Sequence, residues 1–215
     1  QSVVLNDFES TWKYNAEVTW KPENPTQAGW TVTQAVAGDE QDVGLLLSNY
    51  AEIPAYVELA ETAAGPEETE YEECKDVVIE FYSDYTPADY EGCDGLSQTK
   101  CEEICDDYNN NKQECENREQ CYWDADNQLC INRCVYDYGN EKCKGNEKCL
   151  GDEIAATCDG DVWMVSSSVQ VPARPSVSDP STPGEKWVCV RHAWDIAAVP
   201  GTYSFDLEVR PYTPV

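Results

Sequence analysis

Hydrophobic and polar positions alternate along both ends of the chain, and this pattern predicts short β-strands. The clearest strands are expected over residues 12–20 and 203–209, where aromatic and aliphatic side chains alternate with polar ones. Further strands are expected over residues 30–36, 43–47, 55–59, 77–82, 163–171 and 187–194. Proline and glycine turns separate many of these segments. The pattern is typical of a mainly β protein, and we expect a β-sandwich of the immunoglobulin-like class.

Nine of the twelve cysteines interrupt this strand pattern between Cys101 and Cys158, and their spacing nearly repeats. Intervals of three, nine, five and eight residues in 101–129 are followed by three, eight, five and eight in 130–158. The capping-box sequence Thr99-x-x-Glu102 precedes cysteines at helical spacing. We therefore expect a compact tandem repeat, independent of the flanking strands, with one short helix in each unit.

These patterns divide the chain into three segments. We expect an N-terminal β segment over residues 1–73, a cysteine-rich insert over residues 74–158, and a C-terminal β segment over residues 159–215 that completes the sandwich. The acidic stretch 61–74 is interpreted as a linker, because a run of like charges repels itself and buries little.

The cysteine content indicates an oxidising compartment. An even number of cysteines in an acidic chain with a single histidine predicts six intrachain disulfides. Zinc is disfavoured, because the recurring gaps differ from the two-residue gaps of zinc sites. The pairing cannot be read from the spacing, although Cys189 needs a distant partner, for which Cys74 or Cys93 is the natural choice. The cysteines expected in disulfides are Cys74, Cys93, Cys101, Cys105, Cys115, Cys121, Cys130, Cys134, Cys143, Cys149, Cys158 and Cys189.

The formal net charge of −28, from 42 acidic and 14 basic residues, restricts the expected partners. Nucleic acid is excluded, because binding to phosphates requires a basic face. No run of 18 apolar residues occurs, so no membrane insertion is expected. The chain begins at Gln1 with no apolar leader, which we interpret as removal of a secretory signal. We expect a secreted, extracellular protein.

Candidate catalytic and metal-binding residues are few. His192 is the only histidine, lies in an expected strand and has no G-x-S-x-G motif to serve, so we expect a structural role and no enzymatic activity. Acidic pairs are numerous, but none stands in a recognisable glycosidase setting. Asp124, Asp126 and Asn127 resemble the opening of a calcium loop, as do residues 106–111, but neither has the glycine and glutamate of an EF-hand. Calcium is the only cofactor suggested, and no metal ligands are assigned.

The aromatic content leaves several functions open. Seven tryptophans and thirteen tyrosines occur, and Trp123 beside Tyr122 is a candidate for stacking on sugar rings. Alternatively, the tryptophans fill the core or a subunit interface. We expect a structural subunit of an extracellular filament, sheath or surface coat that self-associates into a homopolymer. The alternatives are a secreted carbohydrate-binding module that binds glycans, and a disulfide-rich inhibitor or receptor ligand.

The N-terminal strand is the candidate assembly element. A strand at a chain end can pair with the sheet edge of a neighbouring subunit, and its apolar side chains then set the register. The alternative is that it forms the first strand of its own sandwich. The candidate assembly residues are Val3, Val4, Leu5, Trp12, Tyr14, Val18 and Trp20.

Overall fold

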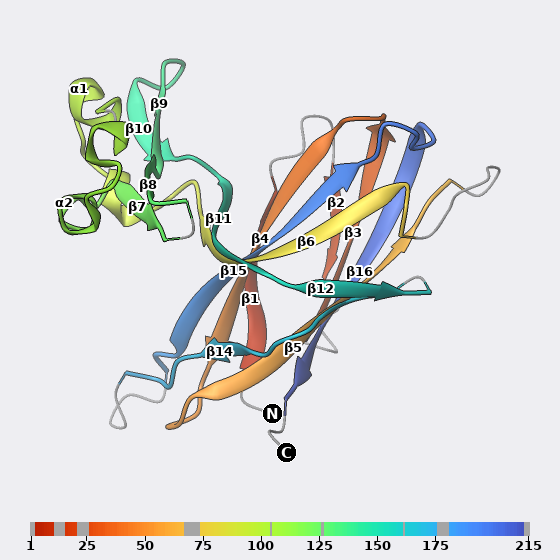
Figure 1. Ribbon diagram of the computed structural model, residues 1–215. Coiled ribbons are helices and arrows are strands. Elements are labelled where there is room, and N and C mark those ends of the chain that lie inside the picture. Colours follow the sequence, from red (N-terminus) through yellow and green to blue (C-terminus); the bar gives the residue numbers. More distant parts are fainter. Residues whose placement is uncertain are drawn as a thin grey trace.

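The computed structural model describes residues 3–10, 16–20, 26–66, 74–103, 105–125, 127–160, 162–175 and 181–212. Trp12 and Tyr14 of the expected first strand lie outside these residues. The described chain is mainly β, as expected, and its strands form antiparallel sheets (Figure 1). None of its helices has the length and apolar character needed to span a bilayer.

Two large sheets form a sandwich. Sheet A contains, in spatial order, β1 (Val3–Ser10), β4 (Glu40–Asn49), β15 (Gly184–Trp194), β6 (Val77–Thr86) and β11 (Lys148–Ile154). Sheet B contains β12 (Ala156–Asp159), β13 (Val162–Val165), β5 (Ala55–Ala64), β16 (Gly201–Pro211), β3 (Gln27–Ala35) and β2 (Ala16–Trp20). Strand β14 (Val169–Val171) also pairs with β5.

One hydrophobic core lies between the two sheets, and the alternation of the sequence explains which side chains enter it. Leu45 and Val188 point inward from sheet A, and Trp30 and Phe205 point inward from sheet B; all are at most 2% exposed. Successive side chains of a strand point to opposite faces, so the residues between them face outward. Each fully buried aliphatic side chain contributes about 1.5–3 kcal/mol.

The strand order is that of a jelly roll. The chain alternates between the sheets through β3, β4, β5 and β6, and then returns so that β11 pairs with β6, β13 and β14 with β5, β15 with β4, and β16 with β3. These nested pairs resemble one long hairpin rolled into two sheets. The immunoglobulin-like order is not confirmed. In that order consecutive strands commonly share a sheet, whereas here each step from β3 to β6 crosses to the other sheet.

The connection between β3 and β4 illustrates how the chain changes sheet. Gly38 has a φ of +80°, a conformation that favours glycine. Its amide donates to the carbonyl of Trp194 at 3.0 Å, and the Trp194 amide donates to the carbonyl of Asp39 at 2.9 Å. The turn is therefore tied to the end of β15 in sheet A.

The predicted linker over residues 61–74 is wrong at its start. Strand β5 continues to Ala64, and the side chain of Glu61 is fully buried in the sandwich. A carboxylate can occupy such a position only when it has a partner, and Glu61 has one in His192 of the opposite sheet. Residues 67–73 lie outside the described residues.

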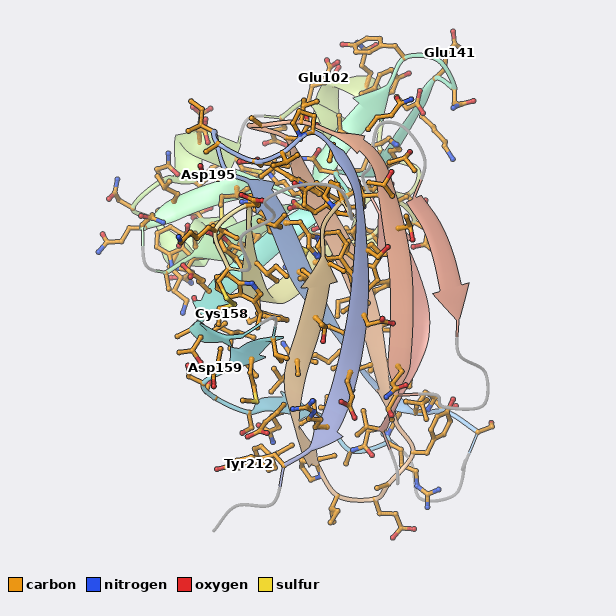
Figure 2. All side chains as sticks on the ribbon, turned by 90° about the vertical axis from the view of Figure 1, so that its right-hand side faces the viewer. Glu102, Glu141, Cys158, Asp159, Asp195 and Tyr212 are labelled. Carbon is orange, nitrogen blue, oxygen red and sulfur yellow. A yellow bond between two sulfur atoms is a disulfide. The ribbon has the colours of Figure 1, made fainter. Side chains whose placement is uncertain are left out.

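A separate unit, which we call the cystine module (residues 91–145), projects from one end of the sandwich between β6 and β11 (Figure 1). Its elements are η1 (Glu91–Cys93), α1 (Gln98–Cys101), η2 (Cys105–Tyr108), α2 (Lys112–Glu116), the hairpin β7 (Cys121–Asp124) and β8 (Leu129–Asn132), and the hairpin β9 (Cys134–Asp137) and β10 (Lys142–Gly145). In Figure 2, Glu102 and Glu141 of the module lie at the opposite end of the molecule from Tyr212.

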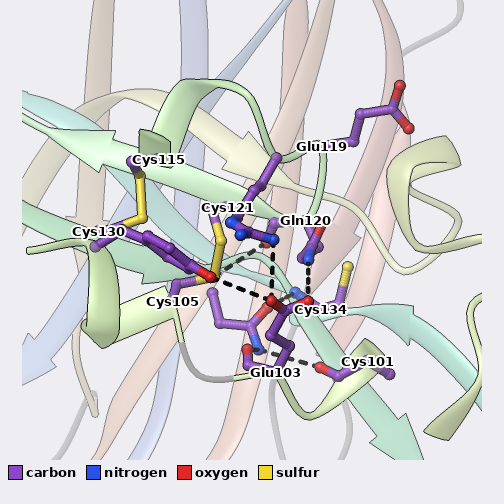
Figure 3. The surroundings of a disulfide bond; sticks show 12 residues. Cys101, Glu103, Cys105, Cys115, Glu119, Gln120, Cys121, Cys130 and Cys134 are labelled. Carbon is purple, nitrogen blue, oxygen red and sulfur yellow. Dashed lines mark hydrogen bonds and ion pairs between the residues drawn. A yellow bond between two sulfur atoms is a disulfide. The ribbon is translucent and has the colours of Figure 1, made fainter. Parts of the chain in front are cut away.

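Disulfides form the interior of the cystine module. Four bonds close within it: Cys93–Cys134, Cys101–Cys143, Cys105–Cys121 and Cys115–Cys130. They make two small buried clusters, one of which Figure 3 shows beside Glu103 and Gln120. Cross-links thus replace an aliphatic core, as expected for so small a unit.

The two cysteine-repeat units do not form equivalent structures. Residues 101–129 carry most of the helical turns, whereas residues 130–158 form strands, and bonds such as Cys115–Cys130 join one unit to the other. The predicted helix in the second unit is therefore wrong. The helix predicted in the first unit forms only in part. Helix α1 begins after Ser97, two residues before the predicted cap, and ends at Cys101; the Ser97 Oγ accepts from the Lys100 amide at 3.4 Å.

The last two cysteines of the apparent repeat belong to the sandwich. Cys149 in β11 bonds to Cys189 in β15, and Cys158 in β12 bonds to Cys74. Neither predicted partner of Cys189 is correct, because β11 returns beside β6 and brings Cys149 to the outer face of sheet A. All twelve cysteines are paired and none is free, which confirms the six predicted disulfides.

Candidate functional site

An open cleft of about 500 Å³ lies where the cystine module meets the outer face of sheet A. Strands β4 and β15, the end of β6 with its following loop, and the module all contribute to it. Aromatic rings and charges of both signs line it, among them Tyr85, Tyr90, Trp187, Asp84, Arg133 and Glu185. Concave sites with aromatic walls and a few convergent polar groups commonly bind small molecules, so we take the cleft as the candidate functional site.

Trp187 reaches the cleft because of its position in β15. Val188 and Val190 are buried in the core, so Trp187 and Cys189 project from the outer face of the sheet. Trp187 lies opposite Leu46 of β4. Its half-buried ring contacts Tyr85 with a centroid separation of 5.5 Å and an interplanar angle of 41°.

Tyr85 forms a rigid support for Trp187. A Cβ at position 44 would lie 2.3 Å from two ring atoms of Tyr85, so only glycine leaves room for this ring against β4. Tyr85 is 1% exposed and packs in one cluster with Cys149 and Cys189. Trp187 is therefore held in place by neighbours that are themselves fixed, which reduces the ordering cost of binding.

Arg133 of the module forms a wall of the cleft. Its guanidinium donates to Asp84 Oδ2 at 2.7 Å and lies over the rings of Tyr90 and Tyr122, 5.2 and 5.0 Å from their centroids. The other oxygen of Asp84 accepts from the Tyr85 amide at 2.9 Å. Burial, and then the carboxylates of Asp152 and Asp84, raise the pKa of Tyr122. Arg133 therefore both anchors the module and shapes the cleft.

A second ion pair lies within sheet A, between β4 and β15, and contacts β11, the strand that follows the module. Arg191 donates to both oxygens of Asp42, at 2.7 and 2.9 Å, and Asp42 Oδ2 also accepts from the Cys149 amide at 2.9 Å. The hydrogen bonds to Asp42 raise the pKa of Arg191. Burial and a hydrogen bond to Glu80 raise the pKa of the neighbouring Tyr82 to about 12, so that Tyr82 remains a neutral donor. The Asp42 carboxylate therefore links β11, the strand that follows the module, to β4 and to Arg191 of β15.

Three further carboxylates surround the cleft. Asp89 and Glu91 come from the segment after β6, and Glu185 comes from β15. All three are exposed, and none forms an ion pair within the described part of the chain. Asp84, in contrast, is paired with Arg133. The cleft therefore carries an excess of negative charge.

His192 lies far from this arrangement, inside the sandwich. Its Nε2 is 2.6 Å from Glu61 Oε1, and both side chains are fully buried. Trp30 and Phe205 enclose the imidazole, with ring centroids 5.5 and 4.2 Å away. The structural role expected for His192 agrees with this position, and the absence of enzymatic activity stays a prediction.

The predicted sugar-stacking and calcium residues have structural contacts. Trp123 packs against the buried disulfides Cys105–Cys121 and Cys115–Cys130, which occupies part of its ring. The two oxygens of Asp124 accept from the amide and the side chain of Asn127, at 3.1 and 3.0 Å, and so stabilise the turn between β7 and β8. Asp126 lies outside the described residues.

In the second acidic loop, Asn109 accepts from the Cys130 amide and Asn111 caps α2. Three groups of closely spaced potential metal ligands occur in the described chain, and each contains cysteines whose sulfurs are already in disulfides.

The candidate assembly strands pair within their own chain. Val3, Val4 and Leu5 of β1 lie opposite Asn49, Ser48 and Leu47 of β4. Val18 and Trp20 of β2 lie opposite Trp30 and Ala28 of β3. Both strands therefore have a partner within their own chain, and pairing with a neighbouring subunit stays a prediction.

The cleft residues were not singled out from the sequence. The sequence places Trp187 among the tryptophans expected to fill the core or a subunit interface, although its alternation with Val188 and Val190 puts it on the opposite face from the core. Tyr85, Gly44 and Arg133 had no local signal, because they meet only through strand pairing and the fold of the module. No protein-family model matches the chain, and no curated protein is significantly similar to it.

Proposed function

We propose that this protein is an extracellular glycan-binding module that holds a short saccharide in the cleft between sheet A and the cystine module. The observation that carries the proposal is Trp187, whose ring is presented in a 500 Å³ cleft by Tyr85 and Gly44. The C–H face of a pyranose ring can pack on the face of an indole, which carries partial negative charge. The jelly-roll order adds an analogy, since lectin domains also use it.

Polar groups around the ring supply the expected orientation. Carboxylate oxygens of Asp89, Glu91 and Glu185 can accept hydrogen bonds from sugar hydroxyls, and Arg133 can donate to ring or hydroxyl oxygens. Six disulfides and the mainly β fold fit an extracellular protein. We propose binding without hydrolysis, so a bound oligosaccharide should be recovered intact.

Removal of the Trp187 ring tests this proposal. Trp187→Ala should weaken binding of the oligosaccharide that the unsubstituted protein binds most tightly. The expected loss is about tenfold or more in affinity, or about 1.4 kcal/mol, as for removal of a central aromatic anchor. Affinities are measured by titration calorimetry after a glycan-array survey. Tyr138→Ala is the matched control, because Tyr138 is 71% exposed and lies on the module outside the cleft lining.

Two outcomes would contradict the proposal. One is that the folded, fully oxidised protein binds no glycan on the array or in solution. The other is that Trp187→Ala and Tyr138→Ala bind equally well while both show the unfolding midpoint of the unsubstituted chain. Release of new reducing ends would overturn the part of the proposal that excludes hydrolysis.

Self-assembly into a filament, sheath or coat is a second candidate. The observation that favours it is that β1 is an outer strand of sheet A, so one of its edges has no partner among the described strands. Such an edge can pair with another copy of the chain. The high negative charge opposes close packing of subunits.

Deletion of residues 1–10 tests the assembly candidate. If β1 joins subunits, the full chain should form ordered polymers in negative-stain images, and the shortened chain should stay monomeric. An added peptide of residues 1–10 should then cap growth. Circular dichroism checks that the shortened chain retains its sheets. Polymerisation of both chains at the same critical concentration would show that β1 has no part in assembly.

A further inference from the structure

The charges around the cleft restrict the kind of saccharide that it can hold. Of its four carboxylates, Asp84 is neutralised by Arg133 at 2.7 Å. Asp89, Glu91 and Glu185 have no ion-pair partner within the described residues. A ligand in the cleft would therefore contact three carboxylates without an ion-pair partner in the part of the chain that the structure describes, and one arginine, Arg133, that is already paired with Asp84.

The three unpaired carboxylates come from segments next to Trp187 in the cleft. Glu185 is two residues from Trp187 on β15, and residues two apart share one face of a strand. Asp89 and Glu91 lie in the segment that follows β6, and β6 is a neighbour of β15 in sheet A. A ring lying on Trp187 would thus have carboxylates available from two separate segments.

We propose that the cleft selects a saccharide with free amino groups, a glucosamine oligomer being the simplest example. This inference rests on the proposed function. The protonated amine would form charge-assisted hydrogen bonds with carboxylates at the rim, while the ring packs on Trp187. The net charge of −28 would also attract a cationic oligomer toward the protein.

The same arrangement disfavours two other classes of saccharide. Uronate or sulfated oligomers would bring negative charge against the three carboxylates, and Arg133 is not free to offset that charge, because it is held by Asp84. N-acetylated oligomers would keep the stacking contact but lose the ammonium group. Selection should therefore depend on the amino group more than on the length of the sugar.

The test compares four tetrasaccharides with the full chain by titration calorimetry: glucosamine, N-acetylglucosamine, glucose and glucuronate oligomers, at a pH where the amine is protonated. The glucosamine oligomer should bind at least tenfold more tightly than the N-acetylated one. Raising the salt from 50 mM to 500 mM should reduce this preference, because rim charges are screened. The triple variant Asp89→Asn, Glu91→Gln, Glu185→Gln should bring the ratio of the two affinities close to one.

Glu141→Gln is the control for this variant, because Glu141 is exposed on the module hairpin outside the cleft lining, and it should keep the tenfold ratio. Equal binding of amino and N-acetylated oligomers, or tighter binding of the glucuronate oligomer, would overturn the inference while leaving glycan binding intact. Binding of none of the four to correctly folded protein would count against glycan binding itself. Loss of the amino-sugar preference in EDTA would show that a divalent cation, and not an amine, occupies the rim.

Discussion

Replacement of Glu61 by leucine should lower the free energy of unfolding by about 1–3 kcal/mol, the usual cost of leaving a buried hydrogen-bonding group without its partner. Glu61 and His192 come from opposite sheets, are both 0% exposed, and approach to 2.6 Å. Without the carboxylate, the imidazole Nε2 would remain among Trp30, Phe205 and Trp194 with no hydrogen-bond partner. His192→Leu should have a cost of the same order, because it strands the carboxylate instead.

A double-mutant cycle distinguishes pairing from simple packing. The double variant Glu61→Leu, His192→Leu should recover a large part of the lost stability, since no unpaired polar group then remains. Stability is measured by guanidinium unfolding with the disulfides intact. Glu58→Leu is the control, because Glu58 lies on the opposite face of β5 and should change stability by only about 0.5 kcal/mol. If the losses in unfolding free energy of Glu61→Leu and His192→Leu simply add in the double variant, the two side chains do not stabilise each other.

Removal of the Cys149–Cys189 disulfide should lower stability by roughly 2–4 kcal/mol and also weaken ligand binding. The bond joins β11 to β15 across a sequence separation of 40 residues. It also forms the base on which Tyr85 packs, next to Trp187. We expect the variant with both cysteines changed to alanine to lose hydrogen-exchange protection in β11 and in the segment from Tyr85 to Tyr90.

Removal of the Cys105–Cys121 bond is the matched comparison. This bond lies wholly inside the cystine module. The buried cluster that contains it includes none of the residues that line the cleft. Its loss should reduce protection in the module and leave β11 protected. If both disulfide variants lose protection in the same segments, the Cys149–Cys189 bond has no special role in supporting the cleft.

Local pattern was sufficient to locate most strands. Segments such as 187–194 and 203–209 alternate so regularly that their inner and outer faces can be assigned before any pairing is known, and β15 and β16 contain them. The pattern was not sufficient to show where one alternating stretch is divided into two strands. The stretch 163–171 divides into β13 and β14, because both short strands pair with β5 around a bend at Ser166 and Ser167.

The acidic residues show a further limit of sequence reasoning. Glu61 lies shortly before a run of glutamates, and its sequence surroundings predict a solvated linker, yet it is the buried partner of His192. Glu185 and Glu91 have the same composition around them as many other surface acids, and only the fold brings them to one cleft. Charge can be counted from the sequence, but its solvation depends on what is packed against it.

The amino-acid sequence by itself determined that this chain is strand-rich, acidic and cross-linked, because strand periodicity, formal charge and the number of cysteines are properties of local or summed composition. Tertiary structure decided the jelly-roll order, the partner of each cysteine and the cleft. These depend on contacts between residues far apart in the chain: Cys189 could have met several cysteines, and β11 brought it Cys149. Trp187, Tyr85 and Arg133 likewise come from three separate segments, and only the pairing of β15 with β4 and β6 and the packing of the cystine module unite them.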